Sequence, residues 1–346
     1  MNKNFKIGNI NIGPDYPPLI IAEIGINHNG NLDSAIQIAD SAIKSGAQVL
    51  KHQTHIPDDE MSQEAKKAIP GNSNRSIYDI ISSCALSEVE EKKLMNHIKS
   101  KKKIFISTPF CKAAVDRLIK FDVPAFKIGS GEWNNLELIK YVCKFKKPII
   151  LSTGMSYLNE LRETVNYINK KKIPLALLHC TNVYPTPLNK SRLNSISLMQ
   201  KTFKNNIIGY SDHTVGLYAP YVALSLGAKI IEKHYVDTHD RKGPDVSCSM
   251  DRYQLKELIK ASKFIPASIP GKKEPIREER VTMNFAFSSV VSRCYIKKGE
   301  VLNEKNICLK RPGNGNFLAK DFRKIIGKKS KSNIQENIQI KIKHVQ

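Results

Sequence analysis

The sequence predicts a (β/α)₈ barrel followed by a small second domain. Eight short apolar runs each end in polar residues, and an amphipathic helical pattern follows each run. Strand followed by helix, eight times over, is the pattern of a parallel sheet that closes on itself. The chain has 346 residues. A bare barrel needs roughly 250, so we expect roughly 60 to 80 residues to form a further unit.

Each barrel element is predicted from its periodicity. Short apolar runs bounded by turn residues favour buried strands, and apolar residues repeating every three to four positions favour helices. The strands are expected at residues 19–24, 47–50, 104–106, 125–128, 148–151, 174–178, 207–210 and 228–231. The helices are expected at residues 32–45, 87–101, 112–121, 135–145, 156–169, 191–203, 216–226 and 251–264.

Three segments interrupt this pattern. Residues 54–84 are too long for a simple connection and predict an excursion over the barrel mouth, and residues 237–250 predict a second long loop. Residues 265–283 are rich in proline and charge, which is typical of a linker. We therefore predict a barrel domain over 1–264, a linker over 265–283 and a small domain over 284–346. So small a domain is expected to dock on another surface.

Composition excludes several classes of protein. The chain is 41% hydrophobic and 25% charged, which is typical of a globular protein. It has no apolar run near the ~18 residues that a membrane span needs, and its first residues lack the features of a secretory signal. Its seven cysteines are scattered without a C-x-x-C pair, which argues against a disulfide framework or a zinc knuckle. We expect a cytoplasmic protein with reduced thiols.

The formal net charge of +23 permits a nucleic acid, an anionic membrane or an acidic substrate as partner. The basic residues are spread along the chain, for example over 91–103 and 170–172, without the interleaved aromatic residues of a base-stacking surface. A lysine-rich compositional bias explains most of the excess. We therefore expect neither nucleic acid nor membrane as partner, although an anionic substrate would benefit from the field.

Two lysines, Lys51 and Lys127, end the second and fourth predicted strands. An ammonium group at a barrel mouth commonly meets phosphate or carboxylate. Hydroxyls and glycine-flanked backbone N–H groups in 107–109, 129–131 and 152–154 are of the kind that hold anions. A salt bridge within the barrel is the alternative for either lysine alone. The whole set predicts an anion-binding pocket built from several strands.

Two histidines, His213 and His234, end the seventh and eighth predicted strands, which are neighbours in a barrel. With oxygen ligands from water, substrate or carboxylates, the pair predicts a site for Mn²⁺ or Mg²⁺. The third nearby His or Cys of a closed zinc site is missing. The alternative for each imidazole is a structural, hydrogen-bonded role.

Carboxylates complete the candidate pocket. Glu23 lies in a strongly apolar strand and must therefore be paired or used, either to activate a water or to hold a sugar hydroxyl. Asp245, Glu132 and Asp212 are expected within reach of the mouth, where they would act directly or as partners of lysine or histidine. Cys180, beside His179, is expected to be a buried thiol and not a nucleophile.

The chain resembles the N-acetylneuraminate (sialic acid) synthases over nearly its whole length. The matching motifs are AEIGINHNG from Ala22, KHQTH from Lys51, DEMS from Asp59, IPGN from Ile69, STPF from Ser107, FKIGSGE from Phe126, LSTGM from Leu151, YPTP from Tyr184, SDHT from Ser211, GPD from Gly243, FAFSSVV from Phe285 and KRPGNG from Lys310. The resemblance implies a TIM barrel followed by an antifreeze-like (SAF, β-clip) domain, in a domain-swapped homodimer. It also implies condensation of phosphoenolpyruvate with open-chain N-acetylmannosamine and water, giving N-acetylneuraminate and phosphate.

The resemblance also implies residue roles. The phosphoenolpyruvate positions are Lys51, Thr108, Lys127, Ser130, Ser152, Asn182 and Ser211. The catalytic positions are Glu23, His213 and His234, and the two histidines would hold a divalent metal, with Mn²⁺ expected and Mg²⁺ or Co²⁺ as alternatives. The sugar positions are Gln53, Glu132, Tyr184, Asp245 and Arg311, with Arg311 contributed by the partner's small domain.

Two residues bear on the sugar. Trp133 stands where the family commonly has a smaller residue such as Cys, and it is expected beside the pocket. His52, expected at the mouth, favours the sialic acid synthases, since relatives that make legionaminic or pseudaminic acid more often have an aromatic residue there. A synthase acting on a diacetamido hexose therefore remains an alternative. A second alternative is an inactive barrel that binds carbohydrate or polyanions.

Overall fold

The computed structural model describes residues 4–70 and 74–346, so Gly71 and Asn72 of the IPGN motif lie outside the described residues. Two compact units divide the chain at 1–270 and 271–346. In the first unit eight strands close into a barrel in the order β10-β3-β4-β5-β6-β7-β8-β9. They are β3 (Leu19–Gly25), β4 (Val49–Thr54), β5 (Ile104–Pro109), β6 (Phe126–Ile128), β7 (Ile149–Ser152), β8 (Leu175–Cys180), β9 (Ile207–Asp212) and β10 (Ile230–His234). All neighbours in the barrel are parallel.

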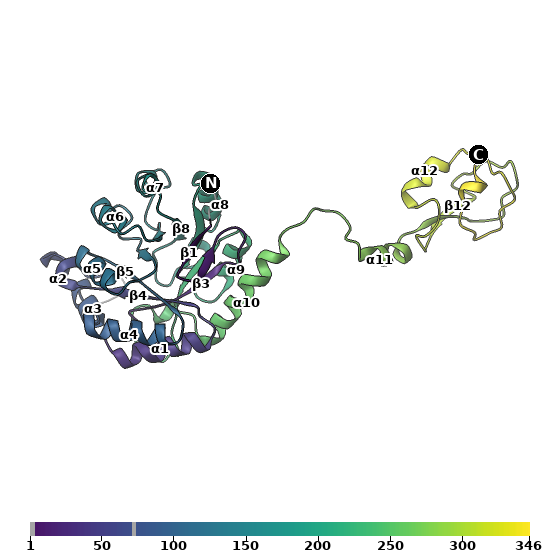
Figure 1. Cartoon of the computed structure of the whole chain (residues 1–346). Helices are drawn as coiled ribbons and strands as arrows, with labels where there is room; N and C mark the ends of the chain where they lie inside the picture. Colours follow the sequence, from purple (N-terminus) through teal and green to yellow (C-terminus); the bar gives the residue numbers. More distant parts are fainter. Residues whose placement is uncertain (1–3, 71–73) are drawn as a thin grey trace. The chain divides into compact units, whose positions relative to one another are not determined.

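Helices surround this barrel (Figure 1). They are α1 (Leu32–Lys44), α4 (Glu88–Ser100), α5 (Lys112–Lys120), α6 (Leu136–Cys143), α7 (Leu161–Lys170), α8 (Asn194–Thr202), α9 (Tyr218–Ser225) and α10 (Arg252–Ser268). Several begin at a polar cap: the side chain of Ser87 forms a capping box with Glu90, and Asp251 forms one with Gln254. The predicted barrel is therefore confirmed, and several of its strands extend into the polar residues that follow the apolar runs.

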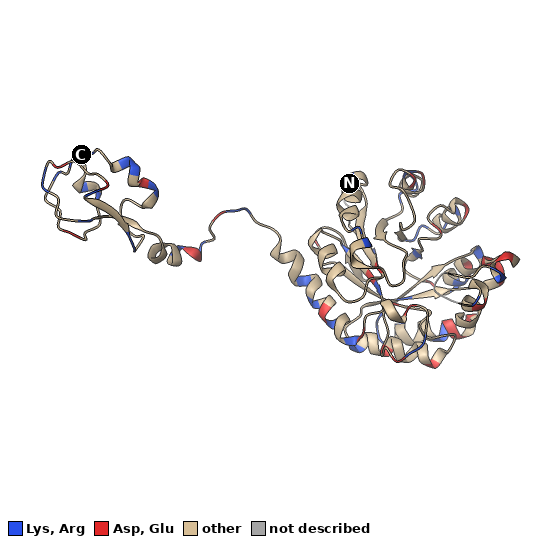
Figure 2. Cartoon of the chain, turned by 180° about the vertical axis from the view of Figure 1, so that it is seen from behind, with Lys and Arg blue, Asp and Glu red and all other residues tan. Residues whose placement is uncertain are grey.

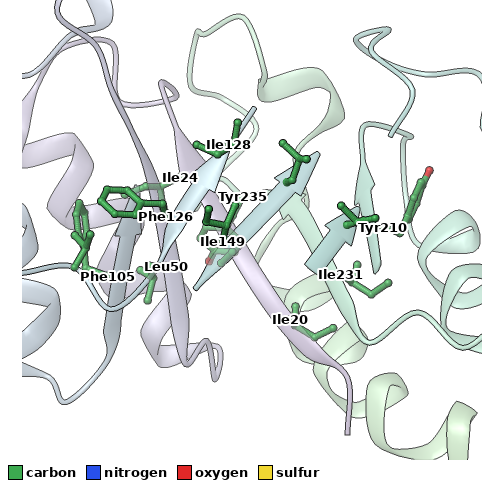
Figure 3. Close-up of a cluster of buried hydrophobic side chains, with 14 of the residues drawn as sticks. Ile20, Ile24, Leu50, Phe105, Phe126, Ile128, Ile149, Tyr210, Ile231 and Tyr235 are labelled. Atoms are coloured by element: carbon green, nitrogen blue, oxygen red, sulfur yellow. The ribbon is translucent and has the colours of Figure 1, made fainter. Parts of the chain in front are cut away.

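The barrel has two separate apolar layers because side chains alternate across each strand. Outward-facing residues such as Leu50, Phe105, Phe126 and Tyr210 pack against the helices (Figure 3). A second cluster contains inward-facing residues of the strands, among them Val49. The second cluster fills the end of the barrel at which the strands begin, and the polar residues are left to the other end.

A hairpin that the sequence analysis did not predict belongs to the second cluster. Strands β1 (Phe5–Ile7) and β2 (Ile10–Ile12) pair antiparallel. Ile7 and Ile12 are buried in the cluster formed by the first residues of the barrel strands. The hairpin therefore plugs the end of the barrel opposite the polar strand ends. Strands of three residues are too short to give a recognisable alternation.

The excursion after β4 carries helices α2 (Pro57–Glu60), η1 (Gln63–Lys66) and α3 (Ile77–Cys84). Ile81 of α3 packs against Ile26, which follows β3, so the excursion is anchored near the mouth. The second long loop contains the short helix η3 (Val246–Cys248). Basic and acidic residues are interspersed along the helices of both units (Figure 2). Among the described residues no helix is long and apolar enough to cross a membrane.

The second unit has a small apolar core of its own, which includes Val290, Ile296 and Ile325. Its elements are α11 (Glu279–Ala286), β11 (Ser289–Ser292), β12 (Ile307–Lys310), η4 (Ala319–Asp321), α12 (Phe322–Ile325) and η5 (Ile342–His344). The segment predicted as a linker is partly helical, since α10 continues through Pro266 to Ser268 and α11 begins at Glu279.

Shortening a buried side chain of the β1–β2 hairpin should lower the free energy of unfolding of the barrel unit. Ile7→Ala removes a side chain with 0% exposure, and large-to-small changes at such sites cost about 2 to 5 kcal/mol. The fluorescence of Trp133, the one tryptophan in the sequence, reports unfolding of the barrel unit because it lies in the barrel's outer core. The free energy of unfolding is measured in urea. Ile10→Ala, at a partly buried position of the same hairpin, is the control. Equal and small losses for both variants would show that the hairpin does not support the barrel.

Candidate active site

One cavity lies at the end of the barrel where the strands finish, and every barrel strand contributes to it. It is lined by Glu23, Ile26, Lys51, Gln53, His55, Ile81, Thr108, Phe110, Lys127, Gly129, Ser130, Gly131, Ser152, Cys180, Asn182, Tyr184, Ser211, His213, Glu232, His234 and Asp245. Parallel strands bring their last residues to one face, where active sites of this architecture form. The structure therefore brings together all but two of the predicted site residues.

A carboxylate shared by two lysines lies in this cavity. Oε1 of Glu232 is 3.8 Å from Nζ of Lys51 and 3.6 Å from Nζ of Lys127, and it also accepts a hydrogen bond of 3.3 Å from Ser211. Both lysine side chains are buried, with 4% and 3% exposure. Glu232 therefore keeps two buried ammonium groups close together, which would otherwise repel each other.

The pKa values of the two lysines move in opposite directions. Burial opposes the charge of Lys51, but the carboxylates of Glu23 and Glu232 together raise its pKa. Burial lowers the pKa of Lys127, which has Glu232 as its main counter-charge. Burial acts against the charge of Glu232 too, yet Lys127 and Lys51 hold the pKa of its carboxyl below the usual value. The carboxylates of Glu232 and Glu23 counter the charge of the two ammonium groups, and both lysines line the cavity, where an anion can accept hydrogen bonds from them.

Hydroxyl groups lie beside both ammonium groups. Lys51 donates to Oγ1 of Thr108 at 3.2 Å, and Lys127 donates to Oγ of Ser152 at 2.8 Å. The backbone N–H of Gly154 donates to Oγ of Ser130 at 3.1 Å. Hydroxyls and ammonium groups from four strand ends thus form a concave set of donors, which is the arrangement that binds phosphate and carboxylate.

Glu23 has one occupied and one free oxygen. Its Oε1 accepts from Nζ of Lys51 at 2.7 Å and from Nε2 of Gln53 at 2.8 Å. Its Oε2 is buried and has no hydrogen-bond partner among the described residues. A buried, unpartnered carboxylate oxygen is costly unless a ligand or water uses it. Glu23 can therefore accept a proton or a hydrogen bond from a bound molecule.

Asp245 is a carboxyl group of the cavity whose surroundings differ from those of Glu23. Burial, together with the charge of Glu23, raises the pKa of Asp245 to about 7. Glu23, in contrast, contacts Lys51 directly through Oε1. Two carboxyl groups with different surroundings in one cavity are a common arrangement for acid and base chemistry.

The two predicted metal-binding histidines lie side by side, with ring centroids 5.3 Å apart. Nδ1 of His213 donates to the carbonyl of Thr181 at 3.0 Å, which leaves a lone pair on Nε2. Nδ1 of His234 is buried, has no hydrogen-bond partner within the described part of the chain and lies 3.5 Å from Oδ2 of Asp245. Burial lowers the pKa of His213 to about 4 and that of His234 well below its usual value. Both rings are therefore neutral near pH 7, as metal ligation requires.

These two imidazoles fit a divalent ion that takes its other ligands from water and substrate. Across residues 4–70 and 74–346, no group of three or more His, Cys, Asp or Glu side chains is arranged to hold a metal. The orphaned Nδ1 of His234 is the observation that favours a ligand at this position.

Several expectations from the sequence need correction. Glu132 does not line the cavity, and its carboxylate accepts a hydrogen bond of 2.7 Å from Asn135. His52 points to the outer face of the barrel, where it pairs with Glu91, and Asp212 points outward too, where it pairs with Lys233 and so takes the second of its two predicted roles, that of a lysine partner. Alternation along a strand explains both, since each lies one position away from an inward-facing residue. Trp133 packs in the outer apolar core and does not line the cavity.

Cys180, Asn182 and Tyr184 lie in the cavity, as expected, whereas the position of Arg311 relative to the cavity is not determined. Cys180 is buried, and burial raises the pKa of its thiol to about 11, so it is protonated and no nucleophile at neutral pH. Tyr184 stacks on His213 with ring centroids 4.0 Å apart, and Asn182 lies beside it. Arg311 belongs to the second unit, so its role stays a prediction.

The sequence places Glu232 among the polar strand-end residues that share the barrel mouth but gives it no role, and it does not single out His55 or Phe110, which also line the cavity. A signal existed for Glu232, because it lies two residues before His234 and so on the same face of its strand. His55 and Phe110 follow β4 and β5, where alternation no longer predicts direction. Their rings stack with centroids 4.3 Å apart.

Removal of the shared carboxylate should change the titration of one lysine more than the other. Glu232→Gln takes away the main charge that raises the pKa of Lys127, so that pKa should fall further below the usual 10.5. The matched variant Glu23→Gln should act mainly on Lys51, whose nearest carboxylate it removes. Side-chain NMR titrations of the lysines check both. An unchanged pKa of Lys127 in Glu232→Gln would contradict the shared ion pair.

Comparison with known proteins agrees with the motifs and the fold. Residues 38–274 match the NeuB family and residues 287–346 match the SAF domain. The chain is 37% identical to N,N'-diacetyllegionaminic acid synthase of Campylobacter jejuni, covering 92% of this chain and 97% of that one. It is 32% identical to pseudaminic acid synthase of the same organism, covering 95% and 96%.

A solved structure shows the same architecture. The N-acetylneuraminic acid (sialic acid) synthetase of Leptospira borgpetersenii, in complex with citrate, superposes with a TM-score of 0.74 at 29% identity, covering 82% of this chain and 96% of that chain. The resemblance predicted from the sequence motifs is thereby confirmed. The chain belongs to the NeuB family and carries a SAF domain at its C-terminal end.

Proposed function

We propose that this chain condenses phosphoenolpyruvate with an open-chain N-acetylated sugar, producing a sialic-acid-type sugar acid and phosphate. The observation that carries the proposal is the pair Lys51 and Lys127, bridged by Glu232 in the same cavity as two neutral imidazoles. One part of this cavity fits a small, highly charged anion. The part that contains the two imidazoles fits a divalent metal ion, which would bind a polar group of the second substrate.

The lysines and hydroxyls would hold phosphoenolpyruvate. Phosphate and carboxylate oxygens accept charge-assisted hydrogen bonds, which the ammonium groups of Lys51 and Lys127 supply. The hydroxyls of Thr108, Ser130, Ser152 and Ser211 and the amide of Asn182 lie around the same part of the cavity. Binding energy from these groups would orient the enol carbon towards the sugar.

The reaction forms a carbon–carbon bond and a carbon–oxygen bond to water, and it breaks the carbon–oxygen bond to phosphate. The enol carbon of phosphoenolpyruvate attacks the sugar aldehyde, whose oxygen takes up a proton and becomes a hydroxyl. A water adds to the neighbouring cationic carbon and gives up one proton; as phosphate leaves, the hydroxyl that came from water loses its second proton and becomes the keto oxygen. Glu23 is suited to orient this water and accept its proton, because Oε2 is buried and unpartnered. Asp245, whose pKa is raised to about 7, can exchange a proton at neutral pH. The carboxylates also stabilise the cationic carbon.

His213 and His234 would hold the divalent metal. When bound, the ion supplies Lewis-acid polarisation of the aldehyde oxygen. We propose Mn²⁺, with Mg²⁺ or Co²⁺ as alternatives, because two imidazoles with oxygen ligands suit ions of this class. Tyr184, which stacks on His213, keeps that ring in place.

Two sugars compete as the second substrate. N-Acetylmannosamine is the expectation from the sequence motifs, and a diacetamido hexose is supported by the 37% identity to a legionaminic acid synthase. His52 cannot distinguish them by contact, because it has 1% exposure and binds Glu91 on the outer face. Discrimination would depend on residues that line the cavity, among them Gln53, Phe110 and Tyr184.

A phosphate-release assay separates these possibilities. The full chain is supplied with phosphoenolpyruvate and either N-acetylmannosamine or the 2,4-diacetamido hexose, with added Mn²⁺ or with EDTA. We expect release that requires phosphoenolpyruvate and one sugar, is lost with EDTA and returns with Mn²⁺. The productive sugar identifies the synthase as an N-acetylneuraminate enzyme or as a legionaminic or pseudaminic acid enzyme. No release with any sugar would favour an inactive, carbohydrate-binding or polyanion-binding barrel.

Arg311 is proposed to complete the sugar site from the SAF domain of a partner chain in a domain-swapped homodimer. Arg311→Ala should raise the KM for the sugar by roughly 10- to 100-fold, because a charge-assisted hydrogen bond is lost, and should leave the KM for phosphoenolpyruvate nearly unchanged. Steady-state kinetics with each substrate varied in turn check this. Arg323→Ala, at an exposed position of the same unit, is the control. Equal loss for both substrates would rule out the sugar-side role.

A further inference from the structure

A series of hydrogen bonds runs from the excursion after β4 to Glu23. Oε1 and Oε2 of Glu60, in helix α2, lie 2.9 and 3.2 Å from Nδ1 of His55. Nε2 of His55 lies 3.0 Å from Oε1 of Gln53. Nε2 of Gln53 lies 2.8 Å from Oε1 of Glu23. The series thus connects a helix outside the barrel to the carboxylate proposed as the base.

Donors and acceptors in this series can be assigned one after another. Nζ of Lys51 donates to Oε1 of Glu23 at 2.7 Å, so this oxygen acts as an acceptor. Gln53 must therefore donate its NH₂ group to Glu23 and present its carbonyl oxygen to His55. Since that oxygen only accepts, Nε2 of His55 carries a proton.

The other ring nitrogen of His55 faces a carboxylate. Both oxygens of Glu60 lie within 3.2 Å of Nδ1, and an ionised carboxylate only accepts, so Nδ1 carries a proton too. With both nitrogens protonated, the ring is an imidazolium cation. The alternative is a neutral ring whose Nδ1 accepts a hydrogen bond from a protonated Glu60.

The surroundings of His55 favour the cation. The side chains of His55 and Glu60 are buried as a pair, with 3% and 6% exposure, which strengthens the attraction between opposite charges. The ring of Phe110 stacks on His55 with centroids 4.3 Å apart and planes 11° from parallel. An aromatic face next to a cation adds a favourable electrostatic contact.

We propose that His55 is a positioning residue, held as an imidazolium by Glu60, which fixes the amide of Gln53 on Glu23. A carboxamide can rotate and exchange its oxygen and nitrogen; the Nε2 proton of His55 opposes that exchange at one end of the amide, and Oε1 of Glu23 opposes it at the other. Glu60 also accepts from the backbone N–H of Ile56 at 3.4 Å, so the pair ties the start of the excursion to the cavity.

The protonation state of His55 is tested directly by ¹⁵N NMR of the histidine side chains in the full chain near pH 7. We expect both ring nitrogens of His55 to be protonated in the unchanged protein. In Glu60→Gln the ring should become neutral with its proton on Nε2, since the new amide can donate to Nδ1. Asp40→Asn, which changes the carboxylate partner of His97 on the outer surface at 2.7 Å, is the matched control and should leave His55 unaltered. One unprotonated nitrogen on His55 in the unchanged protein would overturn the proposal.

The consequence for turnover rests on the proposed function, whereas the protonation state does not. Loss of a group that orients another commonly costs roughly 10- to 100-fold in activity. We therefore expect His55→Ala to lower kcat by that factor with little change in the KM for phosphoenolpyruvate, and Glu60→Gln, which keeps the Nε2 proton that faces Gln53, to lower kcat less than His55→Ala does. An unchanged kcat in folded His55→Ala, measured while the unchanged protein turns over, would refute the positioning role.

Discussion

The structure of the candidate site depends on one carboxylate that two lysines share. Two ammonium groups buried in one cavity repel each other, and burial alone lowers the pKa of each. Glu232 lies within 4 Å of both Lys51 and Lys127 and supplies the opposite charge. The protein can therefore keep two cations ready in a buried place where an anion with several charges would bind. The remaining polar groups are arranged around this cluster.

The outer face of the barrel supports the inner face. Lys233 lies between Glu232 and His234 in β10 and points outward, where its ammonium group binds the carboxylate of Asp212 in the neighbouring strand. His52 lies between Lys51 and Gln53 and points outward to Glu91, which also binds Arg117. Because inward and outward residues share one backbone, fixing the outward side chains limits movement of the inward ones. Buried polar networks of this kind give rigidity when all members are satisfied.

Much of this arrangement could be predicted from the sequence. The period of two in the strands, combined with the rule that parallel strand ends share a face, brought Lys51, Lys127, His213 and His234 together correctly. The hairpin of residues 5–12 escaped prediction because three-residue strands carry almost no periodic signal. Its two buried isoleucines gain their role only from contacts with strands distant in sequence.

The errors concern which way individual side chains point. Some of these residues lie beyond a strand, where alternation no longer applies, and for others the alternation along the strand was not used. His52 is adjacent to cavity residues and was expected at the mouth, although alternation places it outside; Asp212 lies outside for the same reason and acts as the partner of Lys233, one of its two predicted roles. Glu132 follows β6 by several residues, so its direction depends on the turn and on Asn135. His55 lies just beyond β4, and its role requires Glu60 and Phe110 to be brought beside it by tertiary contacts.

A crystal structure with phosphoenolpyruvate bound is the most direct measurement of the central claim. The account predicts that phosphate or carboxylate oxygens of the ligand lie within hydrogen-bond distance of Nζ of both Lys51 and Lys127. A ligand bound away from this pair, with the lysines still paired only to Glu232 and Glu23, would contradict it.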